Sequence, residues 1–331
     1  MPTPRITKKL LLTSAFLLPF AASTAYAQTV LKLAYAENSQ PVKDALHYIG
    51  EAVKEKTNGE VVIQYFPDGQ LGGERELVEM TQVGAIDITK VSSGLLESFS
   101  PQYGVFSLPY LFDTEETFYR VMDNPEIMDG VYQSTAAQGF SGVAWYDSGA
   151  RNFYMSGGPI KAVEDLKGKK IRVMQSETSI KTMQLLGASP IAMSQAEVYT
   201  SLQQGIIDGA ENNEFALTIA RHGEVAKHYT YDMHTRIPDI VVMSNLTKSK
   251  LTEEQLNALN EAFAESIVVQ KNAWNEEMMK TRELAAKQFG VEFYDVDQAP
   301  FKQAVQPIYD DLQKKPELYA LYQQISQAQQ Q

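Results

Sequence analysis

The feature that most constrains the fold is an alternation of short apolar segments with longer amphipathic segments near the start of the chain. Residues 30–34 and 61–65 are short and apolar and predict strands, whereas residues 42–56 and 74–82 repeat apolar side chains at helical spacing and predict helices. A helix between two strands lets them pair in parallel, because it returns the chain to the same end of the sheet. The alternation therefore predicts an α/β fold with a doubly wound sheet.

A second α/β unit is expected to begin near Arg151. Residues 170–173 and 206–208 predict strands, and residues 178–186 and 196–203 predict helices. A single hydrophobic core stops growing at roughly 250–300 residues, and about 300 residues follow the N-terminal segment of this chain. We therefore expect two lobes, each with its own core.

The longest predicted element begins after Thr252. Thr252-Glu-Glu-Gln255 matches a capping box, and neither glycine nor proline occurs between it and Gly290. The segment predicts one long helix, or a kinked pair, that spans both lobes at their hinge. The expected lobes are residues 28–148 with 238–277 for lobe I, and residues 149–237 with 278–331 for lobe II.

The N-terminal segment has the order of a secretory signal. Three basic residues precede the apolar residues 10–22, and Ala25-Tyr-Ala27 supplies small side chains for cleavage. The apolar run is shorter than the roughly 20 residues that a membrane-spanning helix needs, which disfavours an anchor. We expect cleavage after Ala27 and a periplasmic protein.

Composition and missing motifs exclude several classes of function. The formal charge is −12, which disfavours nucleic acid and anionic membrane surfaces as partners. The chain has no cysteine, so it offers no thiol nucleophile and no thiolate metal site. His222 and His228 are six residues apart and do not share a helix face, and phosphate-loop, nucleophile-elbow and zinc-protease motifs are missing. We therefore expect no metal, no cofactor and no enzyme.

Arg172 is the basic residue whose local pattern points inward. It lies between Ile171 and Val173 in a short apolar segment, where a guanidinium is costly unless an anion meets it. A ligand carboxylate could supply that anion through two parallel hydrogen bonds, a charge-assisted pair worth roughly 1.5–3 kcal/mol. The sequence therefore predicts a carboxylate site at Arg172.

Arg151 is a second candidate for the same site, because it opens the second lobe. A salt bridge with Asp147 is the alternative, and the sequence does not favour either role. Two arginines facing one cleft would leave unpaired positive charge when the site is empty. We therefore expect an open, hydrated cleft that closes on its ligand.

Six segments of the chain match one known family when they are taken together. They are Phe66-Pro-Asp-Gly-Gln-Leu-Gly72, Val105-Phe-Ser-Leu-Pro-Tyr110, Gly149-Ala-Arg151, Asp165-Leu-Lys-Gly-Lys-Lys-Ile-Arg-Val173, Met193-Ser-Gln-Ala-Glu-Val-Tyr199 and Gly205-Ile-Ile-Asp-Gly-Ala-Glu-Asn212. In this order they resemble the periplasmic solute-binding subunits of tripartite ATP-independent periplasmic (TRAP) transporters, over essentially the whole mature chain.

The resemblance implies a two-lobe periplasmic binding protein fold that closes over a small organic acid. In the family, the arginine that corresponds to Arg172 forms the principal salt bridge with the ligand carboxylate, and Arg151 and Asn212 stand where assisting residues occur. The loaded protein then delivers its ligand to a two-component, sodium-driven membrane permease. The resemblance thus implies transport without catalysis, and we expect a monomer.

Three further features bear on the ligand class. Ser92 and Leu95 stand where sialic acid-binding members carry glutamate and arginine, which disfavours sialic acid. Asn213 after Asn212, and residues 236–239, resemble the subgroup that takes uronates such as glucuronate and galacturonate. The resemblance therefore favours a uronate, with four-carbon dicarboxylates and other hydroxy or keto acids as alternatives.

Several polar residues near predicted strand ends are candidates for the ligand's hydroxyl groups. Glu37 would repel a carboxylate, so it should face the hydroxylated far end. Capping of the next helix is the alternative role for Gln175 and Ser176, and a structural hydrogen bond is the alternative for His234. The candidates for the hydroxyl groups are Glu37, Asn38, Gln175, Ser176 and Asn213, and His234 and Asp239 are further candidates for contact with the ligand.

Two other functions stay open at this point. A periplasmic hydrolase or lyase could use Glu37 or Asp239 as its acid/base group, although no spacing fixes a catalytic pair. The chain could also be a binding protein for an ATP-driven importer or for a sensor kinase.

Overall fold

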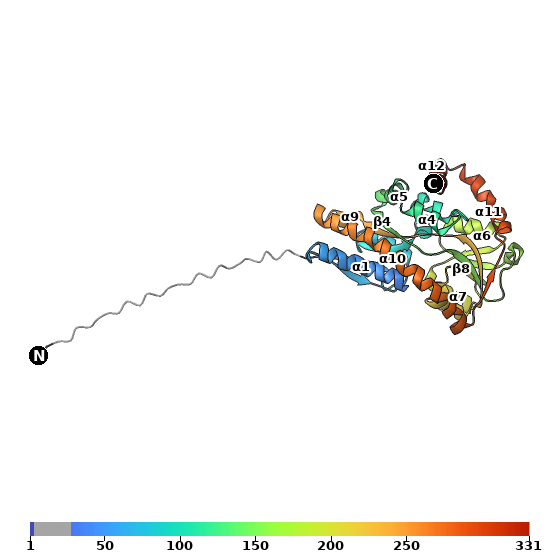
Figure 1. Cartoon of the computed structure of the whole chain (residues 1–331), viewed down its shortest axis with the longest axis horizontal. Helices are drawn as coiled ribbons and strands as arrows, with labels where there is room; N and C mark the ends of the chain where they lie inside the picture. Colours follow the sequence, from blue (N-terminus) through green and yellow to red (C-terminus); the bar gives the residue numbers. More distant parts are fainter. Residues whose placement is uncertain (3–27, 331) are drawn as a thin grey trace.

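The fold is described from a computed structural model, which covers residues 1–2 and 28–330. Two mixed sheets with helices around them make up the folded part (Figure 1). The predicted signal and its cleavage after Ala27 lie outside the described residues. Within the described ranges, none of the helices combines the length and the apolar content that crossing a bilayer requires.

The first sheet contains five strands in the order β2-β1-β3-β10-β4. The N-terminal strands pair in parallel as the sequence pattern predicts, but β10 inserts antiparallel between β3 and β4. The local pattern does not predict β10, which comes from a distant part of the chain and makes the sheet mixed. The strands are β1 (Thr29–Tyr35), β2 (Val61–Phe66), β3 (Ile88–Ser92), β4 (Phe140–Tyr146) and β10 (Asp239–Ser244).

The second sheet contains six strands in the order β11-β9-β5-β8-β6-β7. The strand predicted at residues 206–208 begins later, at Gly209, where β5 comes too close for a side chain. A Cβ atom at Gly209 would lie 2.7 Å from the Tyr154 carbonyl oxygen. The strands are β5 (Arg151–Met155), β6 (Lys170–Val173), β7 (Ser189–Ala192), β8 (Gly209–Asn212), β9 (His228–Thr235) and β11 (Glu292–Asp295).

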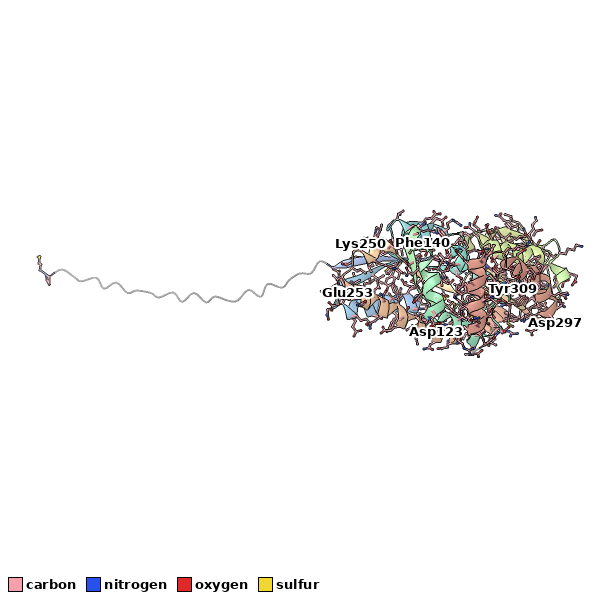
Figure 2. All side chains as sticks on the ribbon, turned by 90° about the horizontal axis from the view of Figure 1, so that it is seen from above. Asp123, Phe140, Lys250, Glu253, Asp297 and Tyr309 are labelled. Carbon is pink, nitrogen blue, oxygen red and sulfur yellow. The ribbon has the colours of Figure 1, made fainter. Side chains whose placement is uncertain are left out.

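The predicted long helix is continuous. α10 (Glu253–Phe289) has 37 residues, so it is about 55 Å long. Its capping box forms as predicted, and Gly290 ends it with a φ of 66°. α10 packs along α1 (Gln40–Lys56) and reaches α8 (Phe215–Thr218) beside the second sheet (Figure 1). Figure 2 shows Glu253, the first residue of α10, at one end of the folded part.

The remaining helices surround the two sheets, and α2, α6 and α7 differ from the predicted helices by at most one residue at either end. They are α2 (Glu74–Gln82), α3 (Ser93–Leu96), α4 (Glu115–Met122), α5 (Pro125–Gln133), α6 (Glu177–Leu185), α7 (Gln195–Gln203), α9 (Asn245–Lys248), α11 (Ala299–Leu312) and α12 (Pro316–Ala328). The 3₁₀ helices are η1 (Pro101–Ser107), η2 (Ala136–Gln138), η3 (Val163–Leu166) and η4 (His222–Glu224).

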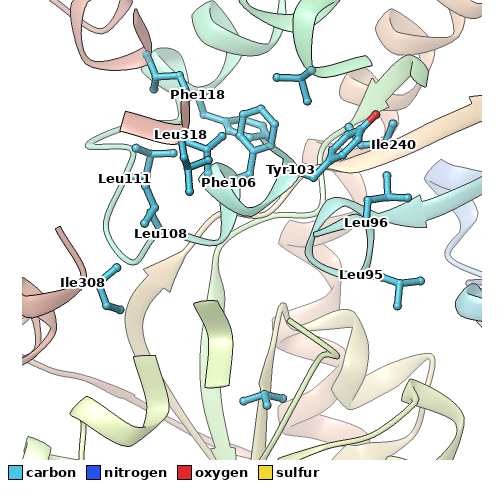
Figure 3. Packing of buried hydrophobic residues seen from close by; sticks show 14 of the residues in the cluster. Leu95, Leu96, Tyr103, Phe106, Leu108, Leu111, Phe118, Ile240, Ile308 and Leu318 are labelled. Carbon is cyan, nitrogen blue, oxygen red and sulfur yellow. The ribbon is translucent and has the colours of Figure 1, made fainter. Parts of the chain in front are cut away.

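The hydrophobic core is only partly divided between the lobes as the sequence predicts. One cluster, which includes Leu46, lies within lobe I, and another, which includes Tyr229, lies within lobe II. A further cluster crosses between them, from Phe106 and from Ile240 in β10 to Ile308 in α11 (Figure 3), and it includes Val173 of the second sheet. The C-terminal helices make this bridge, since α11 packs on α6 while α12 packs on α4 and η1. The lobe boundaries stay a proposal, and these contacts lead us to propose that α12 belongs with lobe I.

Candidate functional site

A cavity of about 640 Å³ lies between the two sheets. This volume is in the range of small-molecule sites. The lining comes from the ends of β1, β3 and β10 on one side and of β5, β6 and β8 on the other. Eight of the nine predicted site residues line it, namely Glu37, Asn38, Arg151, Arg172, Gln175, Asn212, Asn213 and Asp239, and His234 does not.

The two sides of the cavity are in contact, so the structure has a closed cleft. A Cβ atom at Gly73, before α2, would lie 3.2 Å from Ser194 Oγ, before α7. Arg75 Nε donates to Gln175 Oε1 at 2.7 Å across the cleft. Gln175 therefore lines the cavity, and its amide oxygen accepts one of the hydrogen bonds that join the two sides of the cleft. Ser176 instead caps α6, as its alternative role predicts, by accepting from the N–H group of Ser179.

Arg172 is buried at the cavity wall without an acidic partner. Its Nε and Nη2 donate to the Met193 carbonyl oxygen at 3.0 and 2.8 Å, and its Nη1 donates to Gln195 Oε1 at 3.0 Å. Among the described residues, the buried lysines and arginines are Lys90, Arg151 and Arg172, and the first two form ion pairs. Burial lowers the pKa of Arg172, as expected for a cation that nothing neutralises.

Arg151 forms a buried ion pair with Glu211, not with Asp147 as the alternative interpretation supposes. Its Nη2 donates to Glu211 Oε1 at 3.0 Å, and its Nη1 donates to Asn212 Oδ1 at 2.9 Å. Asp147 pairs with Arg236 instead, at 2.8 Å. Because the Asn212 oxygen accepts this bond, its amide group is left as a donor at the cavity wall.

Asn213 lines the cavity, but the protein uses both polar atoms of its side chain. Its Nδ2 donates to the Ser148 carbonyl oxygen at 2.8 Å, and its Oδ1 accepts from the N–H group of Phe215 at 2.9 Å. These bonds fix the turn between β8 and α8. The side chain therefore shapes the wall beside Asn212 and has little hydrogen-bonding capacity left for a ligand.

His234 lies behind the cavity wall, so the expected pocket contact is replaced by a structural role. Its Nδ1 is 2.9 Å from Asp232 Oδ2, and its Nε2 is 3.4 Å from Glu211 Oε2. Burial alone would lower the pKa of His234, but the two carboxylates outweigh it and raise the pKa to about 9. A protonated His234 thus holds Glu211, which in turn holds Arg151.

We expect the free energy of unfolding to fall as the pH rises from 6.5 to 9, because His234 is more basic in the folded protein. The contribution of a raised histidine pKa is complete below pH 6.5 and is lost as the pH passes through about 9. The pKa shift corresponds to about 3 kcal/mol. Urea denaturation at both pH values measures this change.

The matched comparison uses two histidine variants. His234→Gln should lower the free energy of unfolding at pH 6.5 and make its decrease toward pH 9 smaller, whereas the part of the decrease below about pH 8 that comes from the raised pKa of Asp239 should remain. His47→Gln, on the exposed face of α1, should keep the decrease of the unmodified protein. An equal decrease in the His234→Gln protein would contradict the assignment.

The opposite wall of the cavity carries a group of acidic residues around one lysine, which we name the Lys90 cluster: Glu37, Glu74, Lys90 and Asp239. Lys90 Nζ donates to Asp239 Oδ2 at 2.8 Å and to Glu37 Oε2, and Glu74 Oε1 is 4.0 Å away. The Lys90 side chain is 1% exposed, whereas those of Glu37 and Glu74 are 29% and 27% exposed. Glu37 and Glu74 therefore present the cluster to the cavity.

The carboxylates of the Lys90 cluster differ in their pKa. Burial raises the pKa of Asp239 to about 8, although Lys90 opposes the shift. Burial also raises the pKa of Glu74. Burial acts on Glu37 too, but the charge and hydrogen bond of Lys90 prevail and lower its pKa. The cluster is therefore negative overall and holds a proton most readily on Asp239.

Sequence reasoning missed several residues of the site. Lys90 and Glu74 were not candidates, although a lysine inside the apolar segment of β3 signals a buried cation. Glu211 was passed over because its role needs Arg151 beside it. His222 lines the cavity with its Nδ1 2.9 Å from the Tyr154 hydroxyl, and burial, together with Arg172, lowers its pKa to about 4.

A second hollow lies on the surface between Lys56 and the first turns of α10. It is lined by Glu253, Glu254 and Glu261, and its lysine pairs with Glu261 and Glu265 at 3.0 Å. It therefore offers no available cation for an acid. Across residues 1–2 and 28–330, no group of histidine, aspartate or glutamate side chains is arranged to hold a metal ion.

Comparison with known proteins places these features in a family context. Residues 34–315 match the family model described as bacterial extracellular solute-binding protein, family 7. The chain is 72% identical over 303 residues to the uncharacterised protein YiiZ of Salmonella typhimurium, covering 92% of this chain and 93% of that protein. It is 30% identical over 296 residues to the 2,3-diketo-L-gulonate-binding periplasmic protein YiaO of Escherichia coli, covering 88% of each.

Solved structures with the same fold contain sugar acids. A TRAP periplasmic solute-binding protein from Anaerococcus prevotii with bound α/β-D-glucuronate superposes with a TM-score of 0.89, at 40% identity over 92% of this chain and 99% of that one. A protein of the same type from Xanthobacter autotrophicus with bound β-D-galacturonate gives a TM-score of 0.85, at 36% identity over 89% and 98% of the chains.

Proposed function

Because the chain belongs to family 7 of the bacterial extracellular solute-binding proteins, we propose that it captures a hexuronate such as D-glucuronate or D-galacturonate and delivers it to a TRAP permease. The observation that carries the proposal is the buried, acid-free guanidinium of Arg172 at the cavity wall. The uronates bound in similar structures support the ligand class. Like the other members of its family, the protein is a binding protein and not an enzyme.

The ligand carboxylate is proposed to bind at the Arg172 side of the cavity. Its negative charge would compensate the guanidinium, which meets only neutral oxygen atoms in the structure. Arg151 lies close by, but Glu211 neutralises it. It therefore helps to position the ligand and attracts the ligand carboxylate more weakly than Arg172 does. The amide group of Asn212 is a suitable donor to the second carboxylate oxygen. Arg172 is therefore the proposed anchor, and Arg151 and Asn212 are its proposed assistants.

The far end of a uronate carries hydroxyl groups, which suit the Lys90 cluster. Glu37 and Glu74 have oxygen atoms that accept hydrogen bonds from hydroxyls. Asn38 and Gln175 line the same cavity and are proposed as further contacts. A hydrolase role for Glu37 or Asp239 is disfavoured, because Lys90 binds both and the family consists of binding proteins.

The setting of the protein follows from the same proposal. We place it in the periplasm after signal cleavage behind Ala27, as a monomer that meets a two-component, sodium-driven permease. The periplasmic names of its relatives support this location. Binding proteins of ATP-driven importers are the alternative, and family membership favours the TRAP assignment.

A thermal denaturation panel tests the proposed ligand class. D-glucuronate and D-galacturonate at about 100 times their dissociation constants should stabilise the protein by about 2.7 kcal/mol, because only the folded state binds them. For a chain of this size the melting temperature should rise by about 4 °C. D-glucose, which lacks the carboxylate, is the matched control and should give no shift. Equal stabilisation by D-glucose, or no response to either uronate, would contradict the proposal.

A further inference from the structure

The cavity has two poles of opposite charge. Arg172 forms the positive pole, from β6 of the second sheet. The Lys90 cluster forms the negative pole, with Glu37 after β1, Glu74 at the start of α2, Lys90 in β3 and Asp239 in β10. Both poles line one cavity, so a ligand held by its carboxylate at Arg172 directs its other end toward the cluster.

The acids of the Lys90 cluster outnumber its one lysine, even after the ion pairs within the cluster are counted. Three carboxylates surround one ammonium group. Arg75, Arg151 and Arg172 also line the cavity, but Arg75 donates to Gln175 and Arg151 pairs with Glu211. Burial raises the pKa of Glu74, and Arg172 opposes this shift only in part. Burial raises the pKa of Asp239 to about 8, so one proton is held near neutral pH. With three acids around one ammonium group, the cluster presents acceptor oxygen atoms and no uncompensated cation at the cavity wall.

Hydroxyl groups and a second carboxylate would meet this pole differently. Ionised carboxylates only accept hydrogen bonds, so Glu37 and Glu74 can bind hydroxyl donors. A carboxylate on the ligand offers acceptors alone, and it would be buried beside charges of its own sign. Lys90 cannot relieve this repulsion, because its ammonium group already serves Glu37 and Asp239 and is almost fully buried.

We propose that the Lys90 cluster is a charge filter, which admits acids with one carboxylate and a hydroxylated far end and rejects diacids. The inference rests on the proposed function, because it assumes that Arg172 holds one carboxylate. It assigns discrimination to Glu37 and Glu74, with Lys90 and Asp239 holding them in place. Sugar diacids and short dicarboxylates fall outside the ligand class.

Three sugar acids separate the effect of charge from that of shape. D-glucuronate tests whether the site binds a uronate at all. D-gluconate and D-glucarate are open chains of equal length that differ at one end, where gluconate has a CH2OH group and glucarate a second carboxylate. By calorimetry at pH 7.5, glucarate should bind at least about tenfold more weakly than gluconate, because like charges meet at the cluster.

Two variants on the same helix locate the effect. Glu74→Gln removes a negative charge from the cavity wall and should bring the gluconate and glucarate affinities together. Glu79→Gln removes the same charge further along α2. Glu79 lies outside the cavity lining and forms only an exposed pair with Arg75 at 3.9 Å, so this variant should keep the gap. Glu37→Gln repeats the test from the other side of Lys90, in case Glu74→Gln does not fold.

The outcomes distinguish the inference from the proposed function. If glucuronate binds but glucarate binds as tightly as gluconate, the filter is wrong and the uronate proposal stands. Equal narrowing of the gap by Glu79→Gln would also overturn the filter, since the general field of the protein would then explain it. If none of the three acids binds, the proposed function fails first.

Discussion

Arg172→Ala is expected to abolish uronate binding while the protein stays folded. The variant removes one partner of a buried charge pair, and the ligand carboxylate would be left without its counter-charge. Such truncations cost about 2–5 kcal/mol, which corresponds to roughly 30-fold to several thousand-fold in affinity. Calorimetric titration with D-glucuronate measures the loss.

The same substitution should not destabilise the unliganded protein through its charge. In the structure the Arg172 guanidinium is buried and meets only the Met193 and Gln195 oxygen atoms. Removing an uncompensated buried charge relieves a desolvation cost, although alanine leaves a cavity. Arg172→Met fills that space with apolar atoms, so its melting temperature without ligand should equal or exceed that of the unmodified protein.

Two controls sharpen the test of Arg172. Arg172→Lys keeps the charge but loses the planar fork, so its affinity should lie between those of the unmodified protein and Arg172→Ala. Arg221→Ala removes a 64% exposed arginine, paired with Glu224, and should leave the affinity unchanged. A decrease of only a few-fold in Arg172→Ala would show that another group anchors the ligand.

Local sequence patterns predicted most of the helices and strands, but they did not predict which strands pair when these are far apart in the sequence. The capping box at Thr252 and the uninterrupted run to Gly290 define α10, because helix ends depend on neighbouring residues. The antiparallel place of β10 depends on residues 239–244 meeting strands about 100 and 150 positions earlier, which no local signal encodes. The shared core escaped prediction for the same reason, since α11 and α12 close it from the end of the chain.

The candidate site shows the same difference between local features, which the sequence indicates, and distant pairings, which it does not. Arg172 could be found because a charge inside an apolar strand is a local contradiction that calls for a partner. The partners of Lys90 could not be found, since Asp239 lies 149 residues away in the chain. Nearby Asp147 was the one acid that the sequence offered as a partner of Arg151, whereas the antiparallel pairing of β5 with β8 brings Glu211 to it. Sequence thus indicated the charged groups, and the sheet topology decided their pairing.

Glu211→Ala is expected to lower the free energy of unfolding by about 3–5 kcal/mol, the usual cost of breaking a buried ion pair. Glu211 and Arg151 are 3% and 5% exposed at their side chains, and His234 shares the same carboxylate. Without Glu211, the positive charge of Arg151 would stay buried with no acid in contact. Denaturation by guanidinium chloride at pH 7 measures the loss.

The pH dependence of Glu211 supports the same assignment. Burial alone would raise its pKa, but Arg151 and His234 prevail and lower the pKa to about 2. A lowered carboxyl pKa stabilises the folded state above the unfolded value of about 4.5, and the contribution is lost as the pH falls toward 2. The stability gap between the unmodified protein and Glu211→Ala should therefore narrow over this range.

A double variant distinguishes two causes of the stability lost in Glu211→Ala, the broken ion pair and the lost packing. In Arg151→Met with Glu211→Met, both charges are gone and the apolar volume is largely kept, so much of the stability lost in Glu211→Ala should return. Glu283→Ala breaks the exposed pair with Lys287 and should hardly change the free energy of unfolding. If the double variant were no more stable than Glu211→Ala, packing around Glu211 would account for the loss. In that case the ion pair between Arg151 and Glu211 would not be what stabilises this part of the cavity wall.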